Sequence, residues 1–564
     1  MTEHTPPILK WAAPLITVLL LIPFAAPFLG TAHPESGDGL LNLYRAVALR
    51  DALSHGDLWP RLLTVMHFGY GGLNFNYYAP LSYYLPAVLG FGLDAAVAYR
   101  LTVVAYALIA ALGAYALGQR LAGPLAGIGL AAAFVYMPPY FGTFDRLSQL
   151  LAVALLPWVL WAFWRLAEHR RRADFALAVG LLALLPLAHN ITTVYAAPAA
   201  AAIALGIAAV QPERKQSIGV VVAACALAAG LTAFFWLPAL AEQDLVQLNR
   251  LDIPRFDYAN NFLPVAQTFS PGQGLAVGLP QVILGAGGLV LALRTEQPAA
   301  IRVVAVGSAL GFAISVFLTT AASKFLWDTL PLLPIILFPK RLLYAAGLFA
   351  AVLAALAIGL VAKRIANTPL RLGWVALCAA VLIGYAQPAH SIGYMAEPPR
   401  TAEVLDLHNF ERETGFYGAT SNGEFLPVFA REDPYTWRFT DRYIDGEPFA
   451  RLAPNDALTV HSSTWERKSA TLSLTASQPA TLVFEWFYLP GCEVTVNGET
   501  AAPTPTDPEG LISVDVPAGD HTVRIDYGTT MPRVAGSAVS GVMLLAAVGL
   551  LVWWPVSPAE PRSP

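Results

Sequence analysis

Long apolar runs constrain this chain more than any other feature, because a run of about 17 to 25 apolar residues is long enough to cross a bilayer as a helix. The sequence contains roughly twelve such runs. They lie near residues 9–29, 95–118, 122–137, 147–166, 174–188, 191–209, 216–238, 275–293, 301–320, 341–362, 371–387 and 534–554. Of the 564 residues, 56% are hydrophobic and only 13% are charged. We therefore expect a polytopic α-helical membrane protein, with lipid as its main solvent.

Two further apolar pieces, near residues 79–92 and 325–338, are short and contain proline. Non-helical backbone inside a membrane is tolerated only where it is buried in protein or lines a cavity. We therefore expect these two pieces to be re-entrant or interfacial segments.

The positions of lysine and arginine predict the topology. The first apolar run has no small-residue cleavage site, so we expect a retained first span with a cytoplasmic N-terminus. The loops that this orientation places inside contain Arg120, Arg170 to Arg172, Arg214 and Lys215, Arg294 and Arg302, and Lys363, Arg364 and Arg371. This agrees with the positive-inside rule. Segments 31–94, 138–146, 239–274, 321–340 and 388–533 are then outside, and we expect an integral protein of the bacterial cytoplasmic membrane.

The composition changes from about Glu397 onward. Alternating apolar and polar residues predict strands near 471–477, 481–488, 493–496, 512–516 and 521–527. Asn497-Gly498 is a strong hairpin signal. The predicted organisation is a transmembrane domain (1–387), an extracytoplasmic domain resembling a β-sandwich (388–533), a final transmembrane helix (534–554) and a cytoplasmic tail (555–564).

The first predicted outside loop, residues 31–94, is the most polar part of the N-terminal half. Asp38 lies between two glycines and precedes an amphipathic run, which predicts a helix on the membrane surface that ends near Ser54. As the first residue of that helix, Asp38 is either an N-cap or a carboxylate available for chemistry. The glycine- and aromatic-rich residues 69–78 suit a cleft wall at the headgroup level better than a packed soluble core.

Several motifs carry a resemblance to a known family. They are LxxYR at 41–45, GDLWPR at 56–61, YYAPLSYYL at 77–85, PPY at 138–140 with DR at 145–146, HNITT at 189–193, FFWLP at 234–238, FPKR at 338–341 and GEFLP at 423–427. Together they resemble the multi-pass glycosyltransferases of the GT-C superfamily. The most similar branch is the bacterial membrane proteins described as 6-pyruvoyl-tetrahydropterin synthase-related, with a looser similarity to YfhO-like proteins.

This resemblance implies a hexosyl or pentosyl transferase on the outer side of the membrane. Such an enzyme moves a sugar from a polyprenyl-phosphate donor to a cell-envelope glycan, lipid or protein, with inversion at the anomeric carbon. By resemblance, Asp38 is the catalytic residue that deprotonates or orients the acceptor hydroxyl. Glu35, Asp51 and Asp57 are weaker candidates for that role. Arg61 and Tyr78, in the matched GDLWPR and YYAPLSYYL motifs, are candidate substrate-binding residues.

Further candidate substrate-binding residues occur in pairs at predicted outer helix ends. Asp145 is a possible N-cap of the next helix, whereas Arg146 suits a donor phosphate because guanidinium matches phosphate oxygens. His189 and Asn190 either cap two helices at a tight turn or face the active cleft.

Lys340 and Arg341 form an unusual basic pair, because the predicted topology places them outside, against the positive-inside trend. They either extend to lipid phosphates or stabilise a leaving phosphate.

A metal site is less well specified. Asp38, Asp145 and Glu242 or Asp244 carry hard oxygen ligands that suit Mg²⁺ or Mn²⁺, but no spacing signature joins them. The ten histidines are scattered, so the zinc site that pterin chemistry needs is not predicted. The net charge of −4 offers no basic surface for nucleic acid.

The rival interpretation is a non-enzymatic transporter or scaffold for envelope glycolipids. A transporter would place polar sites near the bilayer midplane. Here the polar residues gather at one predicted face, which favours an enzyme.

Overall fold

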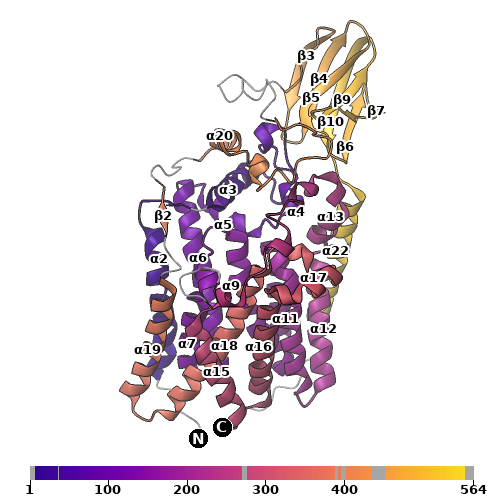
Figure 1. The fold of residues 1–564 in the computed structure, drawn as a ribbon. Coiled ribbons are helices and arrows are strands. Elements are labelled where there is room, and N and C mark those ends of the chain that lie inside the picture. Colours follow the sequence, from indigo (N-terminus) through magenta and orange to yellow (C-terminus); the bar gives the residue numbers. More distant parts are fainter. Residues whose placement is uncertain are drawn as a thin grey trace.

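The computed structural model describes residues 7–35, 37–269, 276–387, 392–395, 402–434 and 451–552. They form a long helical bundle with a β region at one end (Figure 1). Among these residues, eight helices are long and apolar enough to cross a membrane. They are α6 (Ala95–Ala122), α9 (Leu147–His169), α11 (Asn190–Ala209), α12 (Arg214–Leu231), α16 (Ala299–Leu318), α18 (Leu343–Arg364), α19 (Thr368–Ala386) and α22 (Met531–Val552).

The other four predicted spans are bent or short. The first is a helix pair, α1 (Pro7–Leu19) and α2 (Ile22–Leu29), bent by 46° at the break between them. Pro23, the second residue of α2, has no backbone N–H to donate across that break. The remaining three have 12, 17 and 16 residues, at or below the lower end of the range of about 17 to 25 that crosses a bilayer. They are α7 (Pro124–Val135), α10 (Arg172–Ala188) and α15 (Leu279–Arg294).

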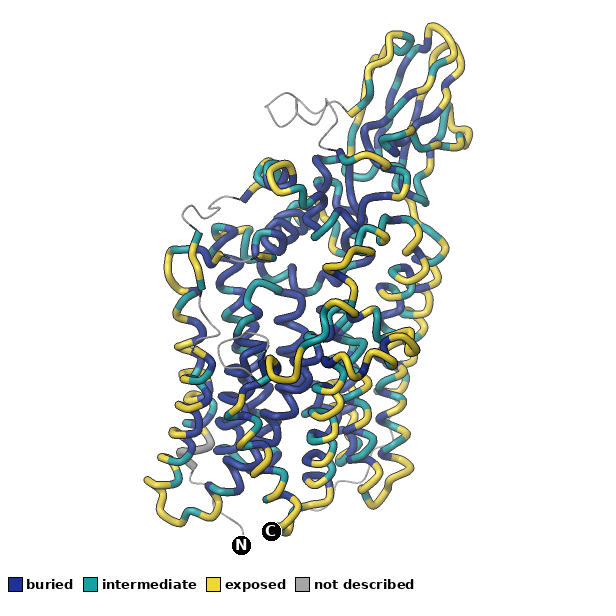
Figure 2. Tube along the Cα trace, in the orientation of Figure 1, coloured by how far each residue is buried: buried dark blue, intermediate teal, exposed yellow. Residues whose placement is uncertain are grey.

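Helix α18 forms the centre of the bundle. In its most apolar stretch 94% of the residues are buried, whereas the corresponding figure for α22 at the periphery is 11%. Exposed residues lie along the outer helices (Figure 2), and many of those on α16, α19 and α22 are large hydrophobic residues, as expected for surfaces that face lipid. Small residues let the inner helices approach closely: a Cβ on Gly288 of α15 would lie 1.9 Å from the Leu353 carbonyl oxygen of α18.

The two short apolar pieces do not form spanning helices. The first contains α5 (Leu81–Leu89), and the second contains α17 (Lys324–Thr329) followed by single 3-10 turns. A helix of nine residues is roughly 14 Å long, about half of the hydrocarbon thickness. The expectation of short re-entrant or interfacial segments agrees with these lengths.

The β region consists of two antiparallel sheets, with strand orders β3-β4-β10-β6-β7 and β5-β9-β8. The five strands predicted from alternation are present, and their ends differ from the prediction by at most about two residues. Asn497 and Gly498 both have positive φ at the β6–β7 turn, as a tight hairpin requires. The strands are β3 (Leu458–Trp465), β4 (Ser469–Ala476), β5 (Ala480–Phe487), β6 (Cys492–Val496), β7 (Glu499–Ala501), β8 (Thr504–Pro505), β9 (Leu511–Val516) and β10 (Gly519–Tyr527).

One apolar cluster joins side chains of both sheets, and a second joins the β region to the bundle. The second cluster contains Phe68, Tyr70 and Leu73, which are fully buried against the 417–430 segment and β5. The prediction that residues 69–78 form a cleft wall is therefore wrong for most of them. The segment that covers them is more than 300 positions away in the chain, so local composition could not show that they are buried.

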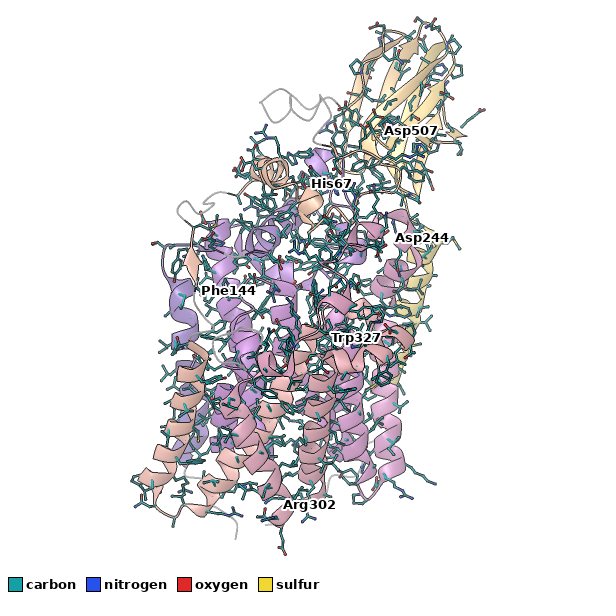
Figure 3. All side chains as sticks on the ribbon, viewed as in Figure 1. His67, Phe144, Asp244, Arg302, Trp327 and Asp507 are labelled. Carbon is teal, nitrogen blue, oxygen red and sulfur yellow. The ribbon has the colours of Figure 1, made fainter. Side chains whose placement is uncertain are left out.

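Three other elements position the site. They are the predicted surface helix α3 (Gly39–Ser54), the short helix α4 (Asn74–Tyr77) and helix α20 (Val404–Thr414), all at the end of the bundle near the β region (Figure 1). Arg302 marks the opposite end (Figure 3). The predicted tail 555–564 lies outside the described residues.

Candidate active site

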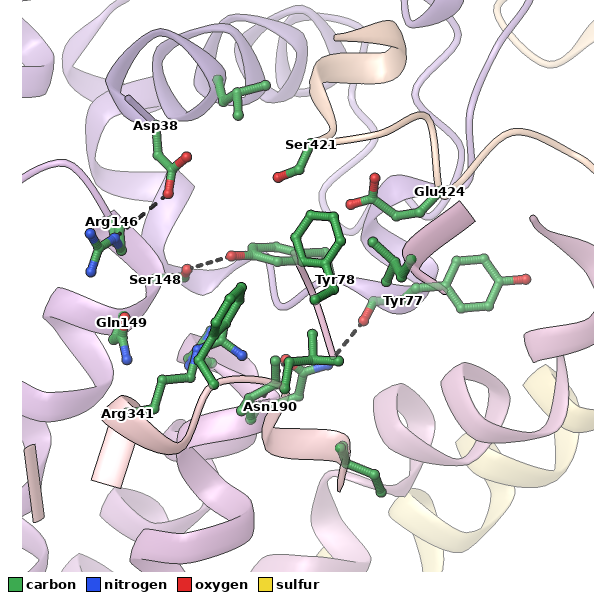
Figure 4. Close-up of a pocket in the computed structure, with 18 of the residues that line it drawn as sticks. Asp38, Tyr77, Tyr78, Arg146, Ser148, Gln149, Asn190, Arg341, Ser421 and Glu424 are labelled. Atoms are coloured by element: carbon green, nitrogen blue, oxygen red, sulfur yellow. Dashed lines mark hydrogen bonds and ion pairs between the residues drawn. The ribbon is translucent and has the colours of Figure 1, made fainter. Parts of the chain in front are cut away.

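A cavity of about 720 Å³ opens where α3, α9, α11 and the start of α18 converge. Asp38 and all but one of the predicted substrate-binding residues line it. These are Asp38, Tyr78, Asp145, Arg146, His189, Asn190, Lys340 and Arg341. Figure 4 labels five of them: Asp38, Tyr78, Arg146, Asn190 and Arg341. They come from five separate parts of the sequence, so the structure brings together what the motifs only suggested.

Asp38 precedes α3 but does not cap it, because its side chain accepts no backbone hydrogen bond at the helix start. Its Oδ2 lies 3.6 Å from Nε of Arg146, and its side chain is 43% exposed. Asn42 holds this corner together by donating to the carbonyl oxygens of Asp38 and Asp145, at 2.7 and 2.6 Å. The Asp38 carboxylate therefore lines the cavity as the partner of Arg146 and not as a helix cap.

Arg146 stands directly before α9 and lies between two carboxylates. Its Nε is 3.7 Å from Oδ1 of Asp145, and it is Arg146, not Asp145, that occupies the N-cap position. Burial lowers the pKa of Arg146, but Tyr344, Asp145 and Asp38 outweigh it and raise the pKa above its ordinary value. Burial also raises the pKa of Asp145, although Arg146 opposes that shift.

Lys340 and Arg341 both lie against the ring of Phe338, at 5.1 and 4.9 Å from its centroid. Nη1 of Arg341 donates to the Ile336 carbonyl oxygen at 2.7 Å. Within the described residues, no carboxylate lies within 4 Å of either cation. The backbone between them and α17 is strained, since Leu337 has a φ of +61°.

His189 is both a cap and a lining residue. Its Nδ1 accepts the Thr192 backbone N–H at 3.2 Å at the start of α11, so the neutral ring carries its proton on Nε2. Burial, with a smaller contribution from Arg341, lowers its pKa to about 3. Asn190 donates to the Tyr77 carbonyl oxygen at 3.2 Å, which joins α11 to the first loop.

Arg45 ends the LxxYR motif but was not among the predicted site residues. It lies in the stretch 41–49 of α3, in which every residue is buried, and its guanidinium is 4.3 Å from the centroid of Tyr78. Its Nε donates to the Ala419 carbonyl oxygen at 2.8 Å, and its Nη1 donates to the Tyr83 hydroxyl at 3.0 Å. The one signal in the sequence was its place in a motif that carries the family resemblance.

Other lining residues were also missed: Ser148, Gln149, Arg255, Tyr344, Ser421 and Glu424. Only Glu424 belongs to a matched motif, GEFLP, and no role was assigned to it.

Arg61 does not belong to this cavity, so its prediction as a residue of this site is wrong. Its Nη1 donates to Oδ1 of Asn76 at 3.2 Å, and its Nη2 donates to the Phe234 carbonyl oxygen. It lines a separate cavity of about 150 Å³ beside Arg533. The Trp59-Pro60 corner turns the side chain towards α13 (Ala233–Ala241) instead.

Of the carboxylates predicted as possible metal ligands, Asp38 and Asp145 both line the cavity beside Arg146, but Glu242 and Asp244 do not join them. Glu242 accepts from Arg533 at 3.0 Å and is absent from the cavity lining, as is Asp244. The described part of the chain contains no group of three or more His, Cys, Asp or Glu side chains that could hold a metal ion. These residues do not fit the predicted site, and no chemical step below uses a metal.

The family follows from the sequence itself. Residues 75–389, more than half of the chain, match the model of a membrane protein family described as the 6-pyruvoyl-tetrahydropterin synthase related domain. The chain belongs to this family. The match confirms the resemblance inferred from the motifs, and it covers α4 to α19 and most of the residues that line the cavity. A search of curated proteins gives no match.

Solved structures with a similar course of the backbone include an oligosaccharyltransferase, an arabinofuranosyltransferase and ArnT. The Archaeoglobus fulgidus oligosaccharyltransferase in the apo form is 12% identical, with a TM-score of 0.47, and the match covers 79% of this chain and 61% of that one. The arabinofuranosyltransferase AftD from Mycobacteria is 17% identical, with a TM-score of 0.43, and the match covers 72% of this chain and 28% of that one. ArnT from Cupriavidus metallidurans, bound to undecaprenyl phosphate, is 13% identical, with a TM-score of 0.39, and the match covers 72% of this chain and 81% of that one. This family member thus spans less than two thirds of the first two structures, and at these identities no activity follows from the likeness.

Proposed function

We propose that this protein is a membrane glycosyltransferase of the GT-C type. It takes a sugar from a polyprenyl-phosphate donor and transfers it to a cell-envelope glycan, lipid or protein acceptor. The observation that carries the proposal is the shared cavity, in which the carboxylate of Asp38 and the cations Arg146, Lys340 and Arg341 face one space.

The charge in the cavity suits a phosphate ester. Arg146 is flanked by carboxylates, whereas Lys340 and Arg341 have only the Phe338 ring and one carbonyl oxygen as described partners. Cations without anionic partners in a desolvated site attract an anion strongly. A lipid phosphate supplies that anion. Its hydrocarbon chain carries no charge and suits the apolar part of the cavity lining, which includes Ile335, Leu337 and Phe338.

The reaction follows from these positions. Asp38 accepts the proton of the acceptor hydroxyl as its oxygen attacks the anomeric carbon, and the bond from that carbon to the phosphate oxygen breaks. The electron pair of that bond stays on the phosphate, whose added charge Arg146, Lys340 and Arg341 stabilise. Attack from the side opposite the leaving group inverts the anomeric carbon, as the family resemblance implies.

The proposed topology places this cavity on the outer side of a bacterial cytoplasmic membrane, with twelve crossings and a sandwich-like β domain outside. The supporting pattern is the separation of basic loops from the cavity: Arg302 lies at one end of the bundle, and His67 and Asp507 lie towards the other (Figure 3). Alkaline phosphatase fused at Gly498 should be active, and the same reporter fused at Arg171 should be inactive. The reverse pattern would overturn this topology.

The function is tested by transfer with purified full-length protein in nanodiscs. Radiolabelled polyprenyl-phosphate sugars serve as donors, and membranes from source cells lacking the gene serve as acceptors. We expect the wild-type protein to move label to the acceptor and Asp38→Asn to abolish transfer without loss of folding, because asparagine keeps the shape but not the basicity.

Donor binding separates the enzyme from the rival function. Undecaprenyl phosphate should bind to Asp38→Asn at least as tightly as to the wild type, because the substitution removes a negative charge 3.6 Å from Arg146 and no group that holds the phosphate. A wild-type protein that binds the lipid but leaves label on it in every acceptor membrane would favour a glycolipid transporter or scaffold and reject the transferase.

A further inference from the structure

A second carboxylate opens into the cavity in addition to the pair beside Arg146. Glu424 lines the same space as Asp38 but comes from the C-terminal side of the bundle, between α20 and the β region. Figure 4 shows its carboxylate near Ser421 and on the opposite side of the cavity from Arg146. The residue is 8% exposed, so its remaining accessible surface is within the cavity.

The backbone around Glu424 is firmly held. Oε2 of Glu424 accepts the Asn422 backbone N–H at 2.9 Å, and the Gly423 N–H is donated to Oγ1 of Thr420 at 2.9 Å. The side chain of Asn422 donates to the Arg250 carbonyl oxygen. One carboxylate oxygen therefore closes a turn, and Oε1 has no hydrogen-bond partner among the described residues.

The charge around Glu424 differs from that around Asp38. Within the described part of the chain no lysine, arginine or histidine nitrogen lies within 4 Å of its carboxylate. Arg45 lies near enough for its charge to interact with that of Glu424, but its guanidinium donates to the Ala419 carbonyl oxygen and the Tyr83 hydroxyl and not to the carboxylate. A carboxylate without an ion-paired cation repels a phosphate, so this side of the cavity does not suit the charged end of a donor.

Neutral hydroxyl groups are the ligands that this side suits. A carboxylate oxygen only accepts hydrogen bonds, and a hydroxyl is a donor that brings no charge. Ser421, which carries a hydroxyl group, lines the same side of the cavity. Phe425 and Tyr77 also line it, but their rings stack on each other and are only 7% and 6% exposed, so they close this side of the cavity.

We propose that Glu424 binds the acceptor by accepting hydrogen bonds from hydroxyl groups of a glycan, while Arg146, Lys340 and Arg341 bind the donor phosphate. The inference rests on the proposed transferase function and assigns its acceptor to a chemical class, a polyhydroxylated sugar. A site built to bind a hydroxyl group strongly rejects a ligand that lacks it, because the buried hydrogen-bond acceptor of the protein is then left unpaired.

A merely structural role for Glu424 must be separated from binding. Glu424→Gln keeps a side-chain oxygen that can accept the Asn422 N–H and removes the charge, whereas Glu424→Ala removes both. The matched control is Glu413→Gln, which removes an exposed carboxylate on α20, outside the cavity lining.

The test uses full-length protein in nanodiscs, a radiolabelled polyprenyl-phosphate sugar, and gene-deleted membranes titrated as acceptor. We expect Glu424→Gln to raise the acceptor concentration for half-maximal rate at least tenfold. The midpoint for the donor and the binding of undecaprenyl phosphate should change less than twofold, and Glu413→Gln should match the wild type.

Each outcome has a distinct meaning. An unchanged acceptor midpoint in Glu424→Gln, with wild-type transfer intact, would overturn the acceptor role alone. Equal losses of donor and acceptor binding would assign Glu424 to the architecture of the turn and reject the proposal. Absence of transfer by the wild-type protein would reject the proposed function, and this inference with it.

Discussion

Glu411 of α20 is the single residue whose replacement should most affect how the C-terminal segment docks on the bundle. Its carboxylate is fully buried and accepts three backbone N–H groups: from His67 at 3.0 Å, Phe68 at 2.9 Å and Gly418 at 2.9 Å. His67 and Phe68 have φ values of +52° and +59°, which non-glycine residues rarely adopt. The carboxylate therefore holds an otherwise unfavourable turn of the first loop against the segment that carries Glu424.

The magnitude follows from the three bonds. Glu411→Ala leaves three buried N–H groups without a partner, at about 1 to 1.5 kcal/mol each, so docking should weaken by roughly 3 to 5 kcal/mol. In Glu411→Gln the remaining oxygen can still accept from His67 and Gly418, while the amide faces the Phe68 N–H, donor against donor. That variant should lose about 1 to 2 kcal/mol.

The pH dependence has a defined sign. Burial raises the pKa of Glu411 from 4.5 to about 8, although the three N–H groups lower it in part. The docked carboxyl thus holds its proton more tightly than an undocked one, so docking is strongest below about pH 4.5. It weakens towards pH 8, by at most about 1.4 kcal/mol per pH unit. The buried His67 and His408 have pKa values lowered to about 4 and remain neutral above pH 5.

Hydrogen exchange measures this docking. Peptides covering 64–72 and 404–426 should lose protection in Glu411→Ala and lose less in Glu411→Gln, while peptides from α18 remain unchanged. Protection factors, corrected for intrinsic exchange, should fall from pH 5 to pH 8 in the wild type and stay level in Glu411→Gln. Equal protection in all three proteins, or a pH slope that survives in Glu411→Gln, would refute the reasoning.

Three further results are expected. Arg341→Ala and Arg146→Ala should each weaken binding of undecaprenyl phosphate at least tenfold, while Arg61→Ala, which changes a cation outside the cavity, should leave it within twofold. If the effect of the Arg341 and Arg146 substitutions instead depends on the anionic lipid content of the nanodisc and not on the donor concentration, these cations contact lipid headgroups. Gly288→Leu should reduce the yield of folded protein, because even a Cβ would overlap the Leu353 carbonyl oxygen, and a normal thermal midpoint in detergent would contradict the tight α15–α18 contact. Asp38→Asn should abolish transfer at every pH, and a rate that recovers at high pH would assign the proton transfer to another base.

The sequence alone determined that this is a membrane protein and where its helices and strands lie, because both properties depend on residues close together in the chain. Runs of apolar residues predicted the helices of a membrane protein, and strict alternation predicted five strands to within about two residues. Local motifs also placed Asp38, Arg146, Lys340 and Arg341 at helix ends, where polar side chains can reach a shared space.

Tertiary structure decided which polar side chains face the cavity. Arg61 and Arg45 are two cations of the same loop region, yet only Arg45 lines the cavity, because partners at Tyr83 and Ala419 direct it there and Phe234 directs Arg61 elsewhere. Glu424 lines the site from a segment that follows α20, which docks on the first loop through Glu411. The direction of each of these side chains depends on contacts between segments that are far apart in the chain. The free energies of such contacts are summed over the whole fold, so they leave no local pattern in the sequence.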